Sequence, residues 1–432
     1  MSSLHLTPTI VWAACSPILT LAIILGVGIY LAKAGIVSSK DSKLLSTILI
    51  NILYPCLLFV NVIIGVNESN VKSFGIMTLA SVGIISLGMV LGLIVLKLTN
   101  PPAGFRYGTV MAAAMGNYGD MVLAITMTVG NLPPFQNGDA AKGVAYVAAF
   151  ICFTNIFFFT IGFKYIGEDF RNLPKEDQGG ELDSIVSETR KQTTTIVESQ
   201  GHASSSSPSK STVDVIQQQQ QDSNTQLEPI LIEDDITTTS PTKAKSQPIA
   251  TFKYWIGILA NPNTVSVILG LTVTMIPQLR NLFYTSDIAS MTSTSQPLAF
   301  MFKSFQMIGN GAVPIGILNV GTALGRLKFA KFAPVRVISG IAVCRLLLMP
   351  VIGIAVVQWL SSAGIINAED KMMRFVIMLE ASVPTASTTV YLTQFWHPRG
   401  EADAIASVIV VQYGIAMITM TFSLAVMLSL LS

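Results

Sequence analysis

Charged residues are scarce in this chain. They make up 12% of its 432 residues, about half of the roughly 25% that soluble domains carry, which excludes an ordinary soluble protein. The basic residues are scattered between apolar segments and form no stripe, which excludes a nucleic-acid-binding surface. Because hydrophobic residues account for 51% of the chain, the sequence predicts an all-α protein embedded in a lipid bilayer.

Cysteine and histidine are also rare. The four cysteines lie in apolar runs, with neither metal-site nor disulfide spacing, and are interpreted as small buried hydrophobes: Cys15, Cys56, Cys152 and Cys344. The three histidines lie in terminal, linker and loop segments: His5, His202 and His397. This pattern excludes a histidine-based catalytic triad and predicts neither a metal site nor a cofactor.

Long apolar stretches dominate the rest of the sequence. A membrane-spanning helix needs about 20 mostly apolar residues, and ten stretches qualify. They are residues 9–31, 44–65, 74–96, 106–130, 143–164, 254–276, 297–323, 335–360, 372–393 and 403–430. The first is too long for the apolar part of a signal peptide and lacks a basic leader, so we expect it to remain as the first span.

A low-complexity segment separates the fifth span from the sixth. It is rich in Ser, Thr and Gln and poor in aromatic residues, and such a composition cannot bury enough apolar surface to order itself. The sequence therefore predicts a first helical repeat at residues 1–165, a disordered linker at 166–251 and a second repeat at 252–432. The linker hydroxyls would be accessible to a kinase if this segment faces the cytosol.

The distribution of Lys and Arg predicts the orientation, because short cytosolic loops are enriched in both. One side of the membrane receives Lys33, Lys40, Lys43, Lys97, Arg106, Lys164, Lys253, Arg326, Lys328, Lys331, Arg336 and Arg399. The other receives Lys72, Lys142, Arg280, Lys303, Lys371 and Arg374. We therefore expect a cytosolic linker and both termini outside or in a lumen, where Asn67 forms a glycosylation sequon.

Five spans on each side of a cytosolic linker imply that the second half is inverted relative to the first, as in many secondary transporters. The second span of each half carries Asn-x-x-x-Pro, at Asn51 and at Asn310. Both fourth spans are interrupted, by glycines around Asn117 in one and by Pro384 in the other. The sequence thus predicts two inverted repeats, each with a broken helix.

The interruptions are the predicted binding site. A helix break inside a bilayer exposes backbone groups that lipid cannot satisfy, so it persists only where protein or water covers it. Half-helix ends that face one cavity can bind an anionic group or a cation. We therefore expect a substrate site at Asn117, Tyr118, Asp120, Pro384 and Thr385, although glycine and proline can also serve close helix packing alone.

Two acids lie deep in these broken spans. Asp120 falls within the first interruption, and Glu380 precedes the second by one turn. An intramembrane carboxylate is costly, about 2.5 kcal/mol or more on insertion scales, so each is either a proton-coupling or substrate-contacting group or a structural acid. Arg345 is the complementary deep cation, either functional or a structural partner for an acid or a helix end.

Uncharged polar residues within the spans have two interpretations as well. Asn51, Asn155 and Asn310 either hydrogen-bond neighbouring helices, for about 1 kcal/mol each, or contact the ligand. Tyr118 either stacks on an aromatic ligand or fills the core.

An enzyme is the alternative to a carrier. The segment Asn-Tyr-Gly-Asp at 117–120 partly matches the Gly-x-Gly-Asp signature of intramembrane aspartyl proteases, which would make Asp120 catalytic. The first position is Asn instead of Gly, no second Asp lies deep in a span, and no Pro-Ala-Leu follows. The sequence therefore favours a protein that is not an enzyme.

Six ordered segments resemble the auxin efflux carrier family, in particular the PIN-likes and their fungal relatives. They are NILYPCLLF, GNYGDMVLAI, NPNTVSVILGL, GAVPIGILNVGTAL, CRLLLMPVIGI and SVPTASTTVYLTQFW. They cover both halves, residues 1–165 and 252–432, and omit the linker.

The resemblance implies ten helices in two inverted five-helix repeats, with a transporter part that moves against a scaffold by an elevator or rocking mechanism. It also implies transport of a small organic anion, which is indole-3-acetate in plant members, often by a homodimer. The resemblance to the PIN-like subgroup favours the endoplasmic reticulum membrane over the plasma membrane. Asn117 to Asp120 match the first crossover of the family, and Pro384 with Thr385 match the second.

One departure affects the substrate. Relatives often have Asn-Leu-Pro where this chain has Asp120, Met121 and Val122, so the first helix must break at Gly116 and Gly119. A charged Asp120 would repel an anion unless it is protonated or paired. This leaves a proton-coupled carrier of a solute other than auxin as a further alternative.

Overall fold

The computed structural model describes residues 8–65, 71–171, 261–284 and 296–432, without the side chains of Val71 and Asp120. The predicted linker beyond residue 171, the start of the predicted sixth span, the sequon at Asn67 and both His5 and His202 lie outside these residues. Helix α8 (Phe163–Arg171) continues past residue 166, where we expected the linker to begin. Asp169 near the end of α8 accepts hydrogen bonds from the backbone N–H groups of Tyr107 (2.9 Å) and Gly108 (2.6 Å), which ties this last turn to the start of α5 (Arg106–Ala114).

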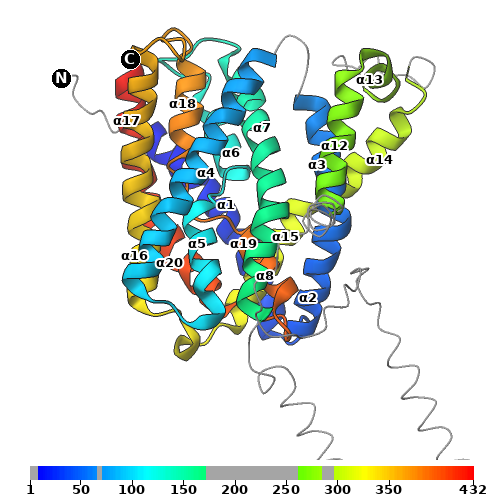
Figure 1. The fold of residues 1–432 in the computed structure, drawn as a ribbon, viewed down its shortest axis with the longest axis vertical. Coiled ribbons are helices and arrows are strands. Elements are labelled where there is room, and N and C mark those ends of the chain that lie inside the picture. The colour runs from blue at the N-terminus through cyan, green and yellow to red at the C-terminus, as the bar shows by residue number, and fades with distance from the viewer. Residues whose placement is uncertain (1–7, 66–70, 172–260, 285–295) are drawn as a thin grey trace, which may run out of the picture. The chain divides into compact units, whose positions relative to one another are not determined.

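The described chain is helical, and its helices run roughly along one direction (Figure 1). Before the linker they are α1 (Pro8–Lys33), α2 (Ser39–Ile48), α3 (Tyr54–Gly65), α4 (Val71–Thr99), α5 (Arg106–Ala114), α6 (Asp120–Val129), α7 (Asp139–Phe157) and α8 (Phe163–Arg171). After it they are α12 (Pro262–Met275), α13 (Pro277–Phe283), α14 (Ala299–Gly309), α15 (Ala312–Arg326), α16 (Val335–Val343), α17 (Met349–Ser362), α18 (Lys371–Glu380), α19 (Thr388–Trp396) and α20 (Asp403–Leu431). Short π-helical turns join α2 to α3, α7 to α8 and α16 to α17: η1 (Leu49–Leu53), η4 (Phe158–Gly162) and η7 (Cys344–Leu348).

Seven of these stretches are long and apolar enough to cross a membrane. They are Pro8–Lys33, Ser39–Gly65, Lys72–Thr99, Asp139–Arg171, Ala299–Arg326, Val335–Ser362 and Asp403–Leu431. The bent pair α12 and α13 makes an eighth if it is counted as one span. The predicted end of that span, residue 276, lies within one residue of the end of α12, and there the chain turns by 111° as Pro277 starts a new helix.

Two further predicted spans are each divided into two short helices. α5 and α19 have 9 residues, and α6 and α18 have 10. At 1.5 Å per residue each is about 15 Å long, half of the roughly 30 Å hydrocarbon core of a bilayer. Neither half of such a pair could cross a membrane alone.

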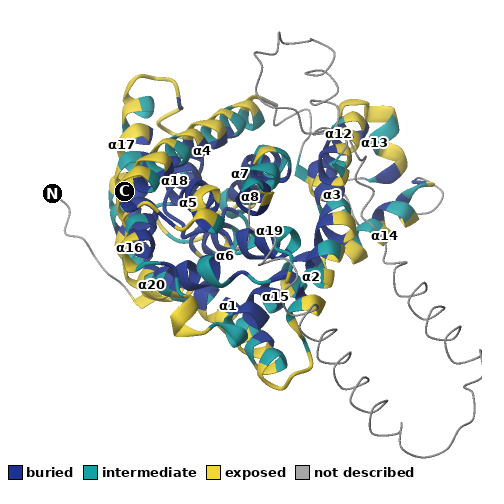
Figure 2. Ribbon diagram, turned by 60° about the horizontal axis from the view of Figure 1, so that its bottom comes forward, coloured by how far each residue is buried: buried dark blue, intermediate teal, exposed yellow. Residues whose placement is uncertain are grey.

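Large apolar side chains cover the outer faces of the helices. Figure 2 shows buried residues toward the inside of the helix assembly and exposed ones around its rim. Leu79 is 73% exposed, Ile418 76% and Met307 80%. A soluble protein rarely exposes apolar surface on this scale, whereas contact with lipid tails requires it, so these faces support an integral membrane protein.

Helices α1 and α15 pack through glycines. A Cβ atom added to Gly28 would lie 2.2 Å from the carbonyl oxygen of Leu318, and one added to Gly321 would lie 2.4 Å from that of Leu25. The two backbones therefore touch directly, as small residues allow at helix interfaces in membranes. This contact makes α1 and α15 a tightly joined pair.

A buried polar cluster joins α2, α15 and α19. The Asn319 amide donates hydrogen bonds to Ser46 Oγ (2.9 Å) and to Gln394 Oε1 (2.8 Å), and Ser46 Oγ also donates to Gln394 Oε1 (3.1 Å). Ser42 Oγ bonds Thr322 Oγ1 at 2.8 Å one turn further along the same helices. These bonds satisfy polar groups that the apolar surroundings would otherwise penalise.

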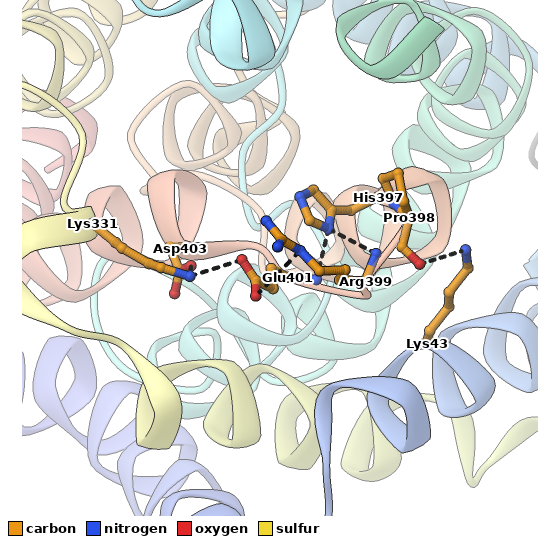
Figure 3. A network of polar contacts seen from close by, with 7 residues as sticks. All are labelled: Lys43, Lys331, His397, Pro398, Arg399, Glu401 and Asp403. Atoms are coloured by element: carbon orange, nitrogen blue, oxygen red, sulfur yellow. Dashed lines mark hydrogen bonds and ion pairs between the residues drawn. The ribbon is translucent and has the colours of Figure 1, made fainter. Parts of the chain in front are cut away.

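The loop between α19 and α20 is fixed by polar contacts at one end of the helices (Figure 3). His397 Nδ1 accepts hydrogen bonds from the backbone N–H groups of Arg399 and Glu401, both at 3.2 Å. Lys331 Nζ pairs with Glu401 at 2.9 Å and with Asp403 at 3.5 Å. Since α19 and α20 both reach the helix breaks described below, this loop helps to position them.

Lowering the pH should destabilise this loop through His397. Burial lowers the pKa of its imidazole to about 4, against about 6.5 in an unfolded chain, and the protonated ring could not accept the two N–H bonds. Between these values the unfolded chain binds more protons, so the stabilisation is complete above about pH 6.5 and is lost as the pH falls toward 4. At about pH 5 we expect a loss of up to about 2 kcal/mol.

The measurement is thermal unfolding of the purified protein at about pH 7.5 and pH 5. His397→Asn keeps an acceptor near the position of Nδ1 but does not titrate, so its unfolding temperature should fall less on acidification than that of the wild type. Equal losses in both proteins would contradict the assignment to His397.

Candidate functional site

The first helix break lies between α5 and α6 and contains residues 115–119. Met115 is extended, with φ −100° and ψ 113°, and Gly116 follows it. A Cβ atom on Gly116 would lie 1.8 Å from Nη2 of Arg345, so only glycine leaves room for that guanidinium. The first break therefore depends on the glycine at position 116.

The second break lies between α18 and α19 and contains residues 381–387, including Pro384. Proline lacks an N–H group and disfavours the α conformation in the residue before it. Residues 381–387 do not continue the helix, and the carbonyl oxygens of Val383 and Pro384 accept hydrogen bonds from Arg345 and from the N–H of Asn117.

The two breaks meet. Asn117 N–H donates to the carbonyl oxygen of Pro384 at 2.8 Å, and Ala386 N–H donates to that of Met115 at 3.0 Å. Gly116 and Thr385 thereby form an isolated antiparallel bridge, and Thr385 Oγ1 donates to Ala112 O at 2.7 Å. We call residues 115–119 and 381–387 together the crossover. Several of its backbone groups satisfy one another, and a break within an apolar environment requires such partners.

Helix α20 supports the crossover with two side chains. Gln412 Oε1 accepts the N–H of Thr385 at 2.9 Å. The Tyr413 hydroxyl accepts from the Asn117 amide at 3.0 Å and donates to the carbonyl oxygen of Thr385 at 3.2 Å. We did not single out either residue from the sequence. The sequence feature that could have identified them is the adjacent pair of uncharged polar residues within the tenth apolar stretch.

Arg345 contacts both halves of the crossover. It lies in η7, is fully buried, and donates from Nε (3.1 Å) and Nη2 to the carbonyl oxygen of Val383. Its Nη1 donates to the Tyr118 hydroxyl at 3.2 Å. The structural interpretation of Arg345 is therefore supported, because it serves a carbonyl that the second break exposes, and it also places a positive charge beside the crossover.

Tyr118 occupies the core in this structure. Its ring packs edge-on against Phe150, with centroids 5.2 Å apart, and its hydroxyl donates to Ala114 O at 2.7 Å. The guanidinium carbon of Arg345 lies 5.4 Å from the ring centroid, within the range of a cation–π interaction.

The two predicted acids lie next to the breaks. Asp120 is the first residue of α6, and its side chain lies outside the described part of the structure. Glu380 is the last residue of α18, directly at the break and not one turn before it. Asp403, at the start of α20, pairs with Lys331 in the loop of Figure 3 and lies outside the crossover.

The predicted asparagines other than Asn117 have different surroundings. Asn51 is exposed in η1 and donates to the Thr47 carbonyl oxygen one turn earlier, at 2.9 Å. Asn310 is exposed at the C-terminal end of α14, and Asn155 lies half-buried in α7. Among the hydrogen bonds of the described residues, none links these three side chains to the crossover, so their roles as ligand contacts stay predictions.

Four helix ends carry partial charges at the crossover. α6 and α19 begin there, and α5 and α18 end there, so two helix N-terminal ends and two C-terminal ends meet at the crossover. Helix N-terminal ends favour anions and C-terminal ends favour cations. The Arg345 guanidinium adds a full positive charge beside these helix ends, next to the Glu380 carboxyl group.

Comparison with known proteins extends this description. A family model described as membrane transport protein matches residues 13–424. Protein PIN-LIKES 2 of Arabidopsis thaliana is 24% identical over 437 residues, which cover 96% of this chain and 93% of that protein. Protein ECM3 of Saccharomyces cerevisiae is 28% identical over 195 residues, which cover 45% of this chain and 32% of ECM3. Since the family model spans both helical halves and the crossover between them, this chain belongs to the membrane transport proteins of the auxin efflux carrier family.

Proposed function

We propose that this chain is a secondary carrier of a small organic anion and that the crossover is its binding site. The observation that carries the proposal is the contact between two broken helices, through the bridge of Gly116 and Thr385, in a member of a transport family. Broken helices of this kind provide ion and substrate sites in secondary transporters. The N-terminal ends of α6 and α19, the amide of Asn117 and the guanidinium of Arg345 would attract a carboxylate.

We also propose ten membrane helices in two inverted five-helix repeats. Seven long helices, the bent pair α12 and α13, and the two broken pairs at the crossover would supply them. Five of these spans precede the linker and five follow it. The broken pairs are the fourth span of each half, as an inverted repeat requires.

Transport would proceed by alternating access, with the crossover helices moving against a scaffold. The glycine-mediated contact of α1 with α15 favours these two helices as part of the scaffold. The crossover helices are instead tied to η7 and α20 through Arg345, Gln412 and Tyr413. A unit held together in this way can move as one body.

The proposed orientation is supported by the loops at one end of the helices. Arg326 bonds the Val37 carbonyl oxygen, Lys43 that of Pro398 and Arg336 that of Asn100, so these basic loops share one end. By the positive-inside rule this end would face the cytosol, with the linker accessible to a kinase. The resemblance to the PIN-likes favours the endoplasmic reticulum membrane as the location of this chain. It also favours a homodimer.

The test combines binding, flux and cleavage. A thermal-shift screen of the purified protein against small organic acids, indole-3-acetate among them, identifies candidate substrates. The same preparation in proteoliposomes should then move the stabilising acid faster than protein-free liposomes do, without cleaving a membrane-embedded peptide. Peptide cleavage that Asp120→Asn abolishes, with no flux of any acid in the screen, would establish the protease alternative instead.

A further inference from the structure

Among the charged side chains that the structure describes beside the crossover, Glu380 has the least favourable surroundings. Its relative exposure is 0%. Both carboxyl oxygens are buried, and neither has a hydrogen-bond partner among the residues that the structure describes. A buried polar group without hydrogen bonds is costly, and an ionised carboxylate in that situation costs far more.

The neighbouring cation does not remove this cost. Arg345 interacts electrostatically with Glu380, but it uses Nε and Nη2 for the Val383 carbonyl oxygen and Nη1 for the Tyr118 hydroxyl. A buried ion pair offsets its desolvation only when geometry and hydrogen bonds are both good. In this structure a charged Glu380 would have Coulomb attraction without a single hydrogen bond.

The other elements packed against α18 add few charges. α18 contacts α4, α6, α7, α17 and α20. Among described residues, the charged and titratable groups that interact with Glu380 are Arg345 and, from the first break, Tyr118. Asp120 starts α6, and its side chain lies outside the described part. The Glu380 carboxyl group is therefore best accommodated here with a proton.

We propose that Glu380 is the proton-binding residue of the carrier and that it binds its proton together with the transported anion. The proposal rests on the proposed function, because it assigns the coupling ion of that same site. With Glu380 protonated, the positive charge of Arg345 is uncompensated beside the crossover and attracts an anion. With Glu380 ionised, the two side chains sum to zero and that attraction is lost.

The same pair links the proton to the backbone of the crossover. When the carboxyl group releases its proton to water, the resulting carboxylate becomes a better partner for the guanidinium than the neutral carbonyl of Val383. Arg345 would then turn from Val383 to Glu380 and leave that carbonyl without its donors. Loss of the proton thus weakens the second break, where the anion is bound.

Because coupling between two ligands is reciprocal, binding of indole-3-acetate should depend on pH. Above the titration of Glu380, each pH unit should weaken the apparent affinity by up to about tenfold. Glu380→Gln resembles the protonated acid, so its affinity should be nearly independent of pH and close to that of the wild type at low pH. Glu380→Asp keeps a titrating group and should restore the pH dependence. Glu168→Gln, in the exposed pair with Arg171, is the matched control.

Infrared spectroscopy of the same proteins tests the proton itself. At neutral pH the wild-type protein should show a carboxylic-acid carbonyl band that is missing from Glu380→Gln and present in Glu168→Gln. If the wild type and Glu380→Gln show the same carbonyl band, Glu380 carries no proton, and the proposal is overturned even if indole-3-acetate binds. A pH-independent affinity for indole-3-acetate in the wild type would overturn the coupling. If the band is present but no acid in the screen is transported, the proton site stands and the proposed function fails.

Discussion

Arg345→Met is expected to lower the free energy of unfolding by about 1.5 to 3 kcal/mol, the range for a lost hydrogen bond to a charged group. The substitution removes the donors to the Val383 carbonyl oxygen. Methionine fills most of the volume but donates nothing, so this carbonyl would remain buried without a partner. The variant buries one charge less, which offsets part of this loss. We still expect a lower free energy of unfolding, because the Val383 carbonyl group lies in an apolar environment where water cannot replace the lost donors.

The measurement is thermal unfolding in detergent, with binding of indole-3-acetate as a second readout. Arg336→Met is the control, since Arg336 is exposed and makes only a 3.4 Å contact with the Asn100 carbonyl oxygen; such surface changes usually stay within about 0.5 kcal/mol. Arg345→Lys keeps the charge but not the planar fork and should lie between wild type and methionine. Equal stability of the two methionine variants would refute the role given to Arg345.

Gly28→Ala is expected to destabilise the protein by about 1 to 3 kcal/mol, as overpacking of a close contact does. The added methyl group would lie 2.2 Å from the Leu318 carbonyl oxygen and 2.8 Å from Cα of Gly321. Both are backbone atoms of α15, so neither can rotate away and the two helices must separate.

Gly26→Ala, on the same helix, provides the control. Nothing lies within 4 Å of a Cβ atom at Gly26, so alanine there should be neutral or stabilise by roughly 0.5 to 1 kcal/mol through helix propensity. Thermal unfolding of both variants gives the comparison. A Gly28 variant as stable as the Gly26 variant would mean that α1 and α15 do not approach as closely as described.

The breaks could be predicted because their cause is local. Glycines at 116 and 119 and a proline at 384 interrupt apolar stretches that are otherwise long enough to span a bilayer, and both stretches are divided in the structure. The long helices follow from the same property, because apolar length alone identifies a spanning segment.

The support of the crossover could not be predicted, because it depends on tertiary contacts. Nothing in the local sequence of Gln412 and Tyr413 indicates that they face residues almost 300 positions earlier or the second break. The hydroxyl of Tyr118 and the guanidinium of Arg345 likewise meet only in the fold. Sequence reasoning identified Asp120 and Glu380 as unusual, but the position of Glu380 at the very end of α18 required coordinates.

The three asparagines show a different limit. Each is a polar residue in an apolar stretch, which predicts an inward-facing role. Asn51 instead satisfies its amide on its own helix, and Asn310 lies at a helix end. Because a side chain that bonds its own backbone needs no partner helix, sequence alone does not distinguish it from one that binds a ligand.

The buried polar cluster of α2, α15 and α19 contains two serine hydroxyls on successive turns of α2. Ser42 and Ser46 lie one helical turn apart, and the Gln394 carbonyl oxygen now engages Ser46. If α19 advanced along α2 by one turn, about 5.4 Å, Gln394 would reach Ser42, whose hydroxyl already contacts Thr322 and Arg326. A step of that size would also break the bonds of Gln394 to Ser46 and Asn319, so this cluster holds α19 in its present register.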